Sequence, residues 1–376
     1  MKTTLYLVRH CESEGNSCRR SQAQFDGIVT RKGLRQADAL AQRFADIPVT
    51  AVYSSDAYRS RMTAQPLADA KGLPVQLRTL LREYTIGIWE GMSIARSARQ
   101  NPELYARWTA TPYDHNIPGA DQFSTVADRG CEAIQRLAKE NPGGTVVAIS
   151  HSCTINCTLT RLLGQPISYY GKVKSGDNTA VTKLEVDEEG NVEVIYINDD
   201  SHLSPELLRQ NYTGRTPDTN FDFEYISFPQ DDERFAAAVA QACEQLSDWN
   251  DAAEIRARVD ESVAQHSTYA FFPVLLERVC GIVTVKRDPS LPADHGMLTG
   301  MFVPDDLRTR GYTEQAFGEA IDVLRRRGCR YLVVENKNDP HFQLLIGRFI
   351  FEPMPGSDTL MRMKLTVPGV EGPLYG

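Results

Sequence analysis

Residues 3–16, TTLYLVRHCESEGN, decide the fold of the first half of this chain. The run TTLYLV is apolar and bounded by polar residues, which is typical of a buried β-strand. It ends in Arg9 and His10, side chains better suited to chemistry than to core packing. The stretch therefore predicts a strand that delivers reactive groups to one edge of a sheet.

Two other apolar runs follow the same plan. The run TAVYS at 50–54 leads to Arg59, and TVVAIS at 145–150 ends at His151. Helical periodicity over 30–44, 58–71 and 122–139 separates these strands, and two more strands are expected at 179–186 and 192–197. This alternation predicts an α/β domain with a largely parallel sheet. Because ligands bind at the carboxyl ends of such strands, we expect one site with two histidines and two arginines.

Such a site suits a phosphate group. An arginine offers a planar fork of donors to two phosphate oxygens, and a histidine nitrogen can attack phosphorus. A carboxyl group is still needed to protonate the departing oxygen. The chain as a whole carries 41 basic and 49 acidic residues, a net charge of −8. This acidic balance argues against nucleic-acid binding, so the basic cluster is expected to be local.

The length of 376 residues predicts two or three domains. The polar stretch 204–220, rich in proline and glycine, is the predicted boundary. The second half is expected to be α+β, with strands at 223–228, 269–287, 297–303 and 331–335 and helices at 232–243, 252–265, 313–327 and 341–348.

Several functional classes are not expected. No apolar run approaches the length of about 18 residues that a membrane span needs, and there is no export signal. The eight cysteines are scattered, which predicts reduced thiols in the cytoplasm, and none of their spacings is typical of a metal site. The oligomeric state is not readable from the sequence.

The ordered motifs of the first half resemble those of the histidine phosphatase superfamily, also called phosphoglycerate mutase-like. The quoted LVRHCESEGN is similar to the family signature LVRHGESxxN. The other matching segments are TRKGLRQADALA at 30–41, YSSDAYR at 53–59, LREYTIGIWEG at 81–91, ISHS at 149–152 and NDDSHL at 198–203. Together they cover 1–204, and the resemblance implies the phosphoglycerate mutase-like fold for that domain.

The resemblance also implies roles for individual residues. His10 would be the nucleophile that becomes phosphohistidine, and Glu83 would be the general acid that later activates water. Arg9, Arg59 and a protonated His151 would hold the phosphoryl oxygens, while Asn16 and Ser152 would contact the substrate. No metal or other cofactor would be needed for this half, and the partner would be a small phosphorylated metabolite.

Departures from the family pattern suggest one more hypothesis. Cys11 replaces the glycine after the first histidine, and Cys153 follows Ser152 beside the second. These thiols either fill space or act as an oxidation switch. Trp89 is expected to be a packing residue, and the lysines at 172 and 174 are expected to be solvated.

The family contains both mutases and phosphatases. The mutase stretch FxGWxD is replaced here by FDGIVT at 25–30, and WEG at 89–91 resembles the phosphatase branch. We therefore favour phosphomonoester hydrolysis, with a phosphoglycerate-type mutase as the alternative. The substrate pocket is expected to involve the variable stretch 92–120.

The second half contains VPDDLRTRGYT at 303–313, which resembles the V-x-P-x-x-R-x-x-G-x-G/A motif of GNAT acetyltransferases. The resemblance covers 222–365. It implies acetyl-CoA as a possible cofactor, with its pyrophosphate on the loop and the following helix N-terminus. The residues concerned would be Val303, Arg308, Arg310, Gly311, Tyr312 and Thr313.

One departure leaves acetyl transfer open. Leu345 stands where the family often has a tyrosine that protonates the thiolate. A ligand-sensing half that binds coenzyme A without turnover is therefore a third possibility.

Overall fold

The computed structural model describes residues 1–173, 175–208, 220–226, 230–245, 268–336 and 340–367. The chain divides into two compact units. The first comprises Met1–Ser13, Ser21–Met92 and Gln100–Asn211, and the second comprises Glu14–Arg20, Ser93–Arg99 and Tyr212–Gly376. Two short segments from the N-terminal half thus belong to the second unit.

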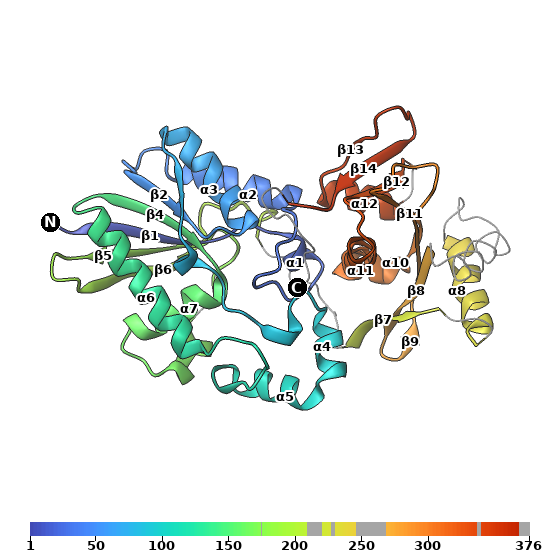
Figure 1. The fold of residues 1–376 in the computed structure, drawn as a ribbon, viewed down its shortest axis with the longest axis horizontal. Coiled ribbons are helices and arrows are strands. Elements are labelled where there is room, and N and C mark those ends of the chain that lie inside the picture. The colour runs from blue at the N-terminus through green and yellow to red at the C-terminus, as the bar shows by residue number, and fades with distance from the viewer. Residues whose placement is uncertain (174, 209–219, 227–229, 246–267, 337–339, 368–376) are drawn as a thin grey trace. The chain divides into compact units, whose positions relative to one another are not determined.

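The first unit is built on a six-stranded sheet in the order β3-β2-β4-β1-β5-β6 (Figure 1). The pairings of β1 with β4, β2 with β4 and β2 with β3 are parallel, whereas β5 runs antiparallel to both β1 and β6. The strands are β1 (Thr3–Arg9), β2 (Ala51–Ser54), β3 (Val75–Leu77), β4 (Thr145–Ser150), β5 (Val181–Val186) and β6 (Val192–Asp199). The predicted α/β class with a largely parallel sheet is confirmed.

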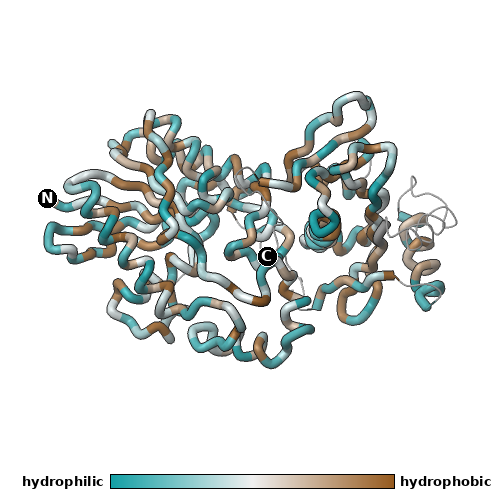
Figure 2. The backbone as a smooth tube through the Cα atoms, viewed as in Figure 1, coloured by the Kyte–Doolittle hydropathy of each residue, from teal (hydrophilic) through white to brown (hydrophobic). Residues whose placement is uncertain are grey.

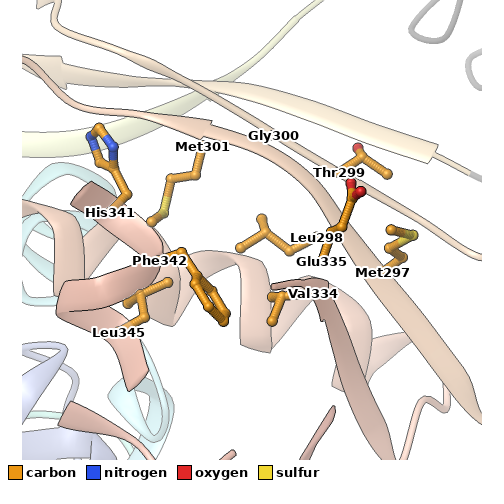
Figure 3. A pocket seen from close by; sticks show the side chains of 10 residues that line it. All are labelled: Met297, Leu298, Thr299, Gly300, Met301, Val334, Glu335, His341, Phe342 and Leu345. Atoms are coloured by element: carbon orange, nitrogen blue, oxygen red, sulfur yellow. The ribbon is translucent and has the colours of Figure 1, made fainter. Parts of the chain in front are cut away.

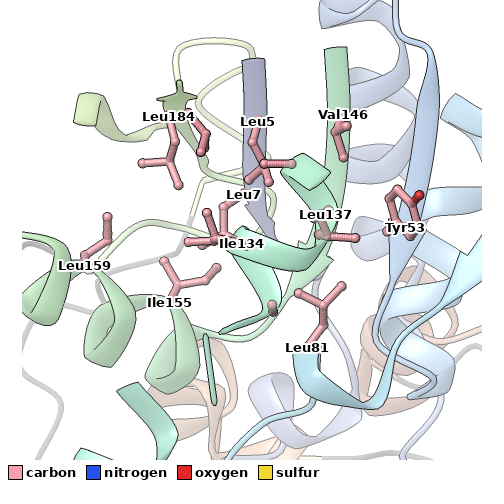
Figure 4. Close-up of a cluster of buried hydrophobic side chains, with 14 of the residues drawn as sticks. Leu5, Leu7, Tyr53, Leu81, Ile134, Leu137, Val146, Ile155, Leu159 and Leu184 are labelled. Carbon is pink, nitrogen blue, oxygen red and sulfur yellow. The ribbon is translucent and has the colours of Figure 1, made fainter. Parts of the chain in front are cut away.

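Helices cover both faces of this sheet. Because successive side chains of a strand point to opposite faces, Leu5 and Leu7 of β1 pack against α6 (Phe123–Glu140) and α7 (Ser152–Leu162). Figure 4 shows this cluster, in which Ile134, Leu137, Ile155 and Leu159 meet the strands. Tyr6 and Val8 face the other way, toward α2 (Arg31–Arg43) and α3 (Tyr58–Lys71). In the hydropathy view of Figure 2, brown apolar residues recur in this unit among white and teal ones.

Shorter elements complete the N-terminal part of the chain. They are α1 (Glu14–Ser17), α4 (Ile94–Gln100), α5 (Pro102–Ala110) and the 3₁₀ turns Thr79–Leu81, Gly87–Trp89, Pro112–Asp114 and Ile167–Lys172. Helices α4 and α5 lie in the stretch 92–120, for which no element was predicted. Trp89 is buried and donates from Nε1 to Asn101 Oδ1 at 2.9 Å, consistent with the packing role predicted for it.

The second unit has its own sheet, in the order β13-β14-β12-β11-β10-β8-β7, with β9 paired to β8. Its strands are β7 (Phe221–Tyr225), β8 (Thr268–Leu275), β9 (Arg278–Val279), β10 (Ile282–Lys286), β11 (His295–Phe302), β12 (Tyr331–Glu335), β13 (Glu352–Pro353) and β14 (Leu360–Lys364). The helices that its C-terminal residues contribute are α8 (Asp232–Gln245), α10 (Asp305–Leu307), α11 (Thr313–Arg326) and α12 (Pro340–Arg348), with a π-helical turn over Arg308–Tyr312. β11 and β12 are parallel only over His295–Met297 and Tyr331–Val333.

The predicted elements of both halves recur with small shifts at their ends. The helix predicted at 252–265, most of the predicted boundary at 204–220 and Lys174 lie outside the described residues. Strands β3, β13 and β14 were not predicted. Among the described residues, none of the helices has the length and apolar character that crossing a membrane requires.

Candidate active site

The sheet register places the two histidines next to each other. Arg9 pairs with Ser150 in the parallel ladder of β1 and β4, and the next residues are His10 and His151. Their ring centroids lie 5.1 Å apart, and both side chains are buried. The carboxyl edge of the sheet therefore brings together two groups that are 141 positions apart in the sequence.

The tautomer of His10 is fixed by a hydrogen bond to its own loop. Its Nδ1 lies 2.7 Å from the carbonyl oxygen of Cys11, an acceptor, so the ring proton sits on Nδ1. Burial, followed by the positive charges of Arg59 and Arg9, holds the pKa of His10 well below its ordinary value. The ring is therefore neutral near pH 7, and its Nε2 keeps the lone pair that a nucleophile needs.

Arg59 is the buried cation of the site. It is the second residue of α3, and it donates to Asp26 Oδ1 at 3.1 Å and to the carbonyl oxygens of Phe25 and Ala23. Its Nη2 also lies 3.1 Å from His151 Nδ1. The remaining donor, Nε–H, has no hydrogen-bond partner among the described residues. A buried donor left unpaired costs about 1–3 kcal/mol, which points to an anion as its acceptor.

His151 differs from the prediction in its charge. Its Nδ1 accepts a hydrogen bond from Arg59, so the proton of the neutral ring is on Nε2, 2.9 Å from Ser55 Oγ. Burial first, and then the charge of Arg59, holds the pKa of His151 well below its ordinary value. The expectation of a protonated His151 was therefore wrong for this arrangement, because an imidazolium cannot accept from Arg59. The positive charge comes from the arginines.

Glu83 is held at the start of α7, the helix that follows His151. Its Oε1 accepts from the backbone N–H of Tyr84 at 3.1 Å and of Thr154 at 2.9 Å, and from Thr154 Oγ1 at 3.0 Å. Its Oε2 accepts from the N–H of Cys153 at 3.1 Å. Glu83 as a whole residue is only 8% exposed, so its carboxyl group does not point into bulk water.

The other predicted site residues of the first half are placed as follows. Arg9 donates from Nη1 to the carbonyl oxygen of Gly176 at 2.8 Å. Ser152 is the first residue of α7 and is partly buried. Asn16 lies in α1, within a segment of the second unit, so its contact with a phosphate stays a prediction.

Sequence reasoning missed two residues that hold the backbone of Glu83. Gln24 Nε2 donates to the Glu83 carbonyl oxygen at 2.9 Å. Arg129 Nη2 donates to the carbonyl oxygens of Arg82 at 2.9 Å and Glu83 at 3.2 Å. Arg129 lies on α6. Neither residue belongs to a motif, so only the fold could reveal them.

The two cysteines near the histidines are buried. Burial raises the pKa of the Cys11 thiol to about 12 and raises that of Cys153 well above its ordinary value. Cys153 Sγ faces Cys157 Sγ at 3.8 Å, one helical turn away. Because oxidation proceeds through an accessible thiolate, this environment disfavours the hypothesis of an oxidation switch. Among the described residues there is also no His/Cys/Asp/Glu cluster able to hold a metal ion.

The loop of the second unit that is predicted to hold the acetyl-CoA pyrophosphate has a backbone conformation that glycine adopts easily. Gly311 adopts φ 82°, in the left-handed region, within the turn Arg308–Tyr312. Thr313 then opens α11, and its Oγ1 is buried without a hydrogen-bond partner among the described residues. Tyr312 is buried against Phe221, with ring centroids 4.7 Å apart, so its ring is a packing group. Arg308 pairs with Asp305, and Arg310 is partly buried.

A pocket opens where β11 and β12 diverge (Figure 3). Its volume of about 70 Å³ gives room for about five water-sized groups, which suits a slender chain. The lining residues come from β11, β12 and α12, and they are Met297, Leu298, Thr299, Gly300, Met301, Val334, Glu335, His341, Phe342 and Leu345.

Two residues next to this pocket bear on the GNAT resemblance. The backbone nitrogen of Val303 lies 2.9 Å from His341 Nε2, so its N–H has a partner within the protein. Leu345 is buried and lines the pocket at the position where the family often has a tyrosine. The pocket thus contains no phenol at that position.

Comparison with known proteins finds a different family match in each half of the chain. A family model described as histidine phosphatase superfamily (branch 1) matches residues 5–200, and one described as acetyltransferase (GNAT) family matches residues 235–344. Phosphoserine phosphatase 1 of Hydrogenobacter thermophilus is 30% identical over 199 residues, covering 53% of this chain and 93% of that protein. Probable phosphoglycerate mutase GpmB of Serratia proteamaculans is 34% identical over 162 residues, covering 43% and 75%.

Among solved structures, Bacillus stearothermophilus YhfR matches with a TM-score of 0.51 and 28% identity, covering 53% of this chain and 98% of that one. The matched region holds His10, Arg59, Glu83 and His151. Both resemblances noted in the sequence are confirmed. The chain belongs to the histidine phosphatase superfamily and carries a GNAT-family domain in its C-terminal half.

Proposed function

We propose that the first unit hydrolyses phosphomonoesters through a phosphohistidine formed on His10. The observation that carries the proposal is the fixed tautomer of His10, whose Nδ1–H is bound to the Cys11 carbonyl oxygen. This leaves an unprotonated Nε2 in a buried site beside two arginines. Attack on phosphorus requires a nitrogen lone pair. A neutral imidazole held in one orientation has that lone pair and keeps it near pH 7.

The first chemical step transfers the phosphoryl group to the enzyme. Nε2 of His10 forms a bond to phosphorus as the bond to the ester oxygen breaks, and the proton of a protonated Glu83 goes to that oxygen. Arg9 and the unpaired Nε–H of Arg59 stabilise the spreading negative charge.

The second step releases phosphate. The Glu83 carboxylate takes a proton from water as the oxygen attacks phosphorus, and the bond between phosphorus and Nε2 breaks. Glu83 is then protonated and His10 neutral, which is the state that began the cycle. No metal is part of this scheme, because guanidinium groups supply the charge that phosphoryl transfer needs.

A direct test replaces His10 by Gln, which keeps an amide donor for the Cys11 carbonyl oxygen but cannot be phosphorylated. We expect complete loss of p-nitrophenyl phosphate hydrolysis, with unchanged circular dichroism showing a retained fold. Retained hydrolysis would show that His10 is not the nucleophile.

A mutase is the second candidate, because one of the similar proteins carries that name. Phosphoserine and phosphoglycerates are the first substrates to test, since the names of the similar proteins point to them. A panel of small phosphorylated metabolites separates the two activities. Release of inorganic phosphate supports hydrolysis, whereas movement of the phosphoryl group within the substrate without release supports the mutase.

For the second unit we propose binding of acyl-coenzyme A without assigning acyl transfer. The pocket between the diverging β11 and β12 suits the pantetheine arm, and the Gly311 turn with the unpaired Thr313 Oγ1 suits the pyrophosphate. The bound cofactor would present a thioester. Leu345 offers no proton for a departing thiolate, so binding is better supported than turnover.

Calorimetric titration of the full chain with acetyl-coenzyme A tests this second proposal. Saturable heat that Gly311→Val abolishes would support it, because valine resists the left-handed backbone of the loop. An absence of heat from the folded wild-type protein would exclude acetyl-coenzyme A as the ligand.

A further inference from the structure

Helix α11 has a polar face that is buried. The sequence alternates apolar residues with Glu314, Glu319 and Asp322, which is typical of a helix with one face in water. Instead, every residue from Thr313 to Arg325 is buried. Charged groups are rarely buried unless they are paired. The elements that cover this face are therefore expected to supply partners of opposite charge.

Two segments from the N-terminal half cover it. Glu14–Arg20 and Ser93–Arg99 belong to the same compact unit as α11. Both lie within residues 5–200, which match the histidine phosphatase family. They also pair with each other, through a bridge between Arg20 and Ser93. The second unit thus contains parts of the chain that belong by sequence to the phosphatase.

Buried or partly buried ion pairs join these segments to α11. Arg20 contacts Glu319 Oε2 at 3.0 Å and Asp322 Oδ2 at 2.9 Å, and Arg96 contacts Glu319 Oε1 at 2.7 Å. The side chains of Arg20 and Glu319 are 2% and 0% exposed. Removing a single partner would therefore leave an uncompensated buried charge.

The pair nearest to the phosphatase signature is bidentate. Arg325 donates from Nη1 and Nη2 to the two carboxylate oxygens of Glu14, each at 2.6 Å. The two parallel bonds fix orientation as well as distance. Glu14 is the first residue of α1, which also contains Asn16. Glu14 follows the nucleophile His10 by four positions in the chain.

Steric fit adds an observation that does not depend on charge. A Cβ placed on Gly318 of α11 would lie 2.5 Å from the Cβ of Cys18. Cys18 is buried, with 1% of its surface exposed. The absence of a side chain at Gly318 therefore lets the segment Glu14–Arg20 lie directly against the helix.

We propose that the polar face of α11 is a docking surface for the segment Glu14–Arg20, and that it positions the end of the His10 loop for catalysis. Arg325 and Gly318 are positioning residues, and Asn16 is the group whose placement depends on them. The functional part of this inference rests on the proposed phosphatase activity. The docking itself can be tested without any activity.

Alkylation of Cys18 tests the docking in the full-length protein. Native protein and protein unfolded in guanidinium chloride are treated with N-ethylmaleimide, and the peptide containing Cys18 is quantified by mass spectrometry. We expect Cys18 to react far more slowly in the native protein, and Arg325→Met to make it reactive. The control Arg362→Met removes a cation paired with Glu352 elsewhere in the unit and should leave Cys18 protected. Equal rates in native and unfolded wild-type protein would overturn the docking.

A steric variant tests the effect on catalysis. Alanine favours helices more than glycine does, so Gly318→Ala should raise the melting temperature if this face is open. Docking predicts the opposite, a lower melting temperature. It also predicts a KM for p-nitrophenyl phosphate raised about tenfold, because a displaced Asn16 would lose its hydrogen bond to the charged phosphate. In Gly318→Ala/Cys18→Gly the obstructing Cβ is gone, and KM should return toward the value of Cys18→Gly alone.

The outcomes separate the two proposals. If Gly318→Ala is more stable and its KM is unchanged, the positioning is wrong. The positioning is equally wrong if Cys18 becomes reactive in Arg325→Met while the kcat and KM of that variant remain those of the wild type. An inactive wild type with a protected Cys18 would instead contradict the proposed phosphatase and leave the docking supported.

Discussion

Replacing Glu83 by Gln removes the proposed proton donor and keeps the shape of the side chain. The structure predicts two separate consequences. The glutamine oxygen can still accept from Tyr84 and Thr154, but its amide nitrogen then faces the N–H of Cys153, 3.1 Å from the present Oε2. Two donors facing each other leave a buried polar group unsatisfied, which costs about 1–3 kcal/mol of stability.

The effect on catalysis depends on the leaving group. An alkyl phosphate releases a strongly basic alkoxide, so loss of the general acid should lower kcat/KM by about 10²–10⁴-fold. Nitrophenolate is stable without a proton, so kcat/KM for p-nitrophenyl phosphate should fall much less. The parameter kcat/KM is the right one, because it reports the steps up to departure of the leaving group, whereas kcat also includes hydrolysis of the phosphohistidine.

The assay compares the two substrates with wild type, Glu83→Gln and the control Glu140→Gln, a partly exposed carboxylate paired with Arg78. Thermal unfolding of each variant reports the stability cost separately. An equal loss of kcat/KM for both substrates would refute proton donation by Glu83 to the leaving oxygen. Unchanged kinetics would remove Glu83 from the mechanism altogether.

Two further outcomes are expected. The folded-state pKa values of His10 and His151 lie below those of the unfolded chain, and that of His202 is lowered to about 4 by burial. The unfolded chain therefore binds more protons in acid, so the free energy of unfolding should fall as pH drops below about 6.5, measured by urea titration at several pH values. Because Cys11 and Cys153 are buried thiols with raised pKa, brief peroxide treatment should leave phosphatase activity unchanged, and loss reversed by a thiol reductant would contradict this.

Much of the first unit is readable from its sequence because the relevant signals are local. The apolar runs ending at His10 and His151 identify buried strands, and parallel strands bring their carboxyl ends to one edge. Glu83 is recognisable from the family motif but not from periodicity. Some of the hydrogen bonds that hold it come from Thr154 and Arg129, which lie far along the chain and in no motif.

The charge state of His151 shows where composition misleads. A histidine among arginines and a phosphate is expected to be protonated, but its state depends on which atom faces Nδ1. Here that atom belongs to Arg59, a donor, and burial acts in the same direction. Such pairwise orientation is absent from the sequence.

Helix α11 shows the same limit on a larger scale. Its alternation of apolar and charged residues predicts a solvated face. Only the fold shows that Glu14 and Arg20 are buried against it and that Arg96 is partly buried there. These partners precede the helix by more than 200 positions. Periodicity identifies which residues share a face but not what covers that face.

Detection of the covalent intermediate tests the central proposal most directly. Full-length protein is mixed with an excess of a ³²P-labelled phosphomonoester, quenched in alkali during turnover, digested and analysed by mass spectrometry. We predict one phosphoryl group on the imidazole of His10, labile in acid and absent from His10→Gln. Sustained turnover with label on another residue, or with His10 unmodified at every quench time, would contradict the proposal.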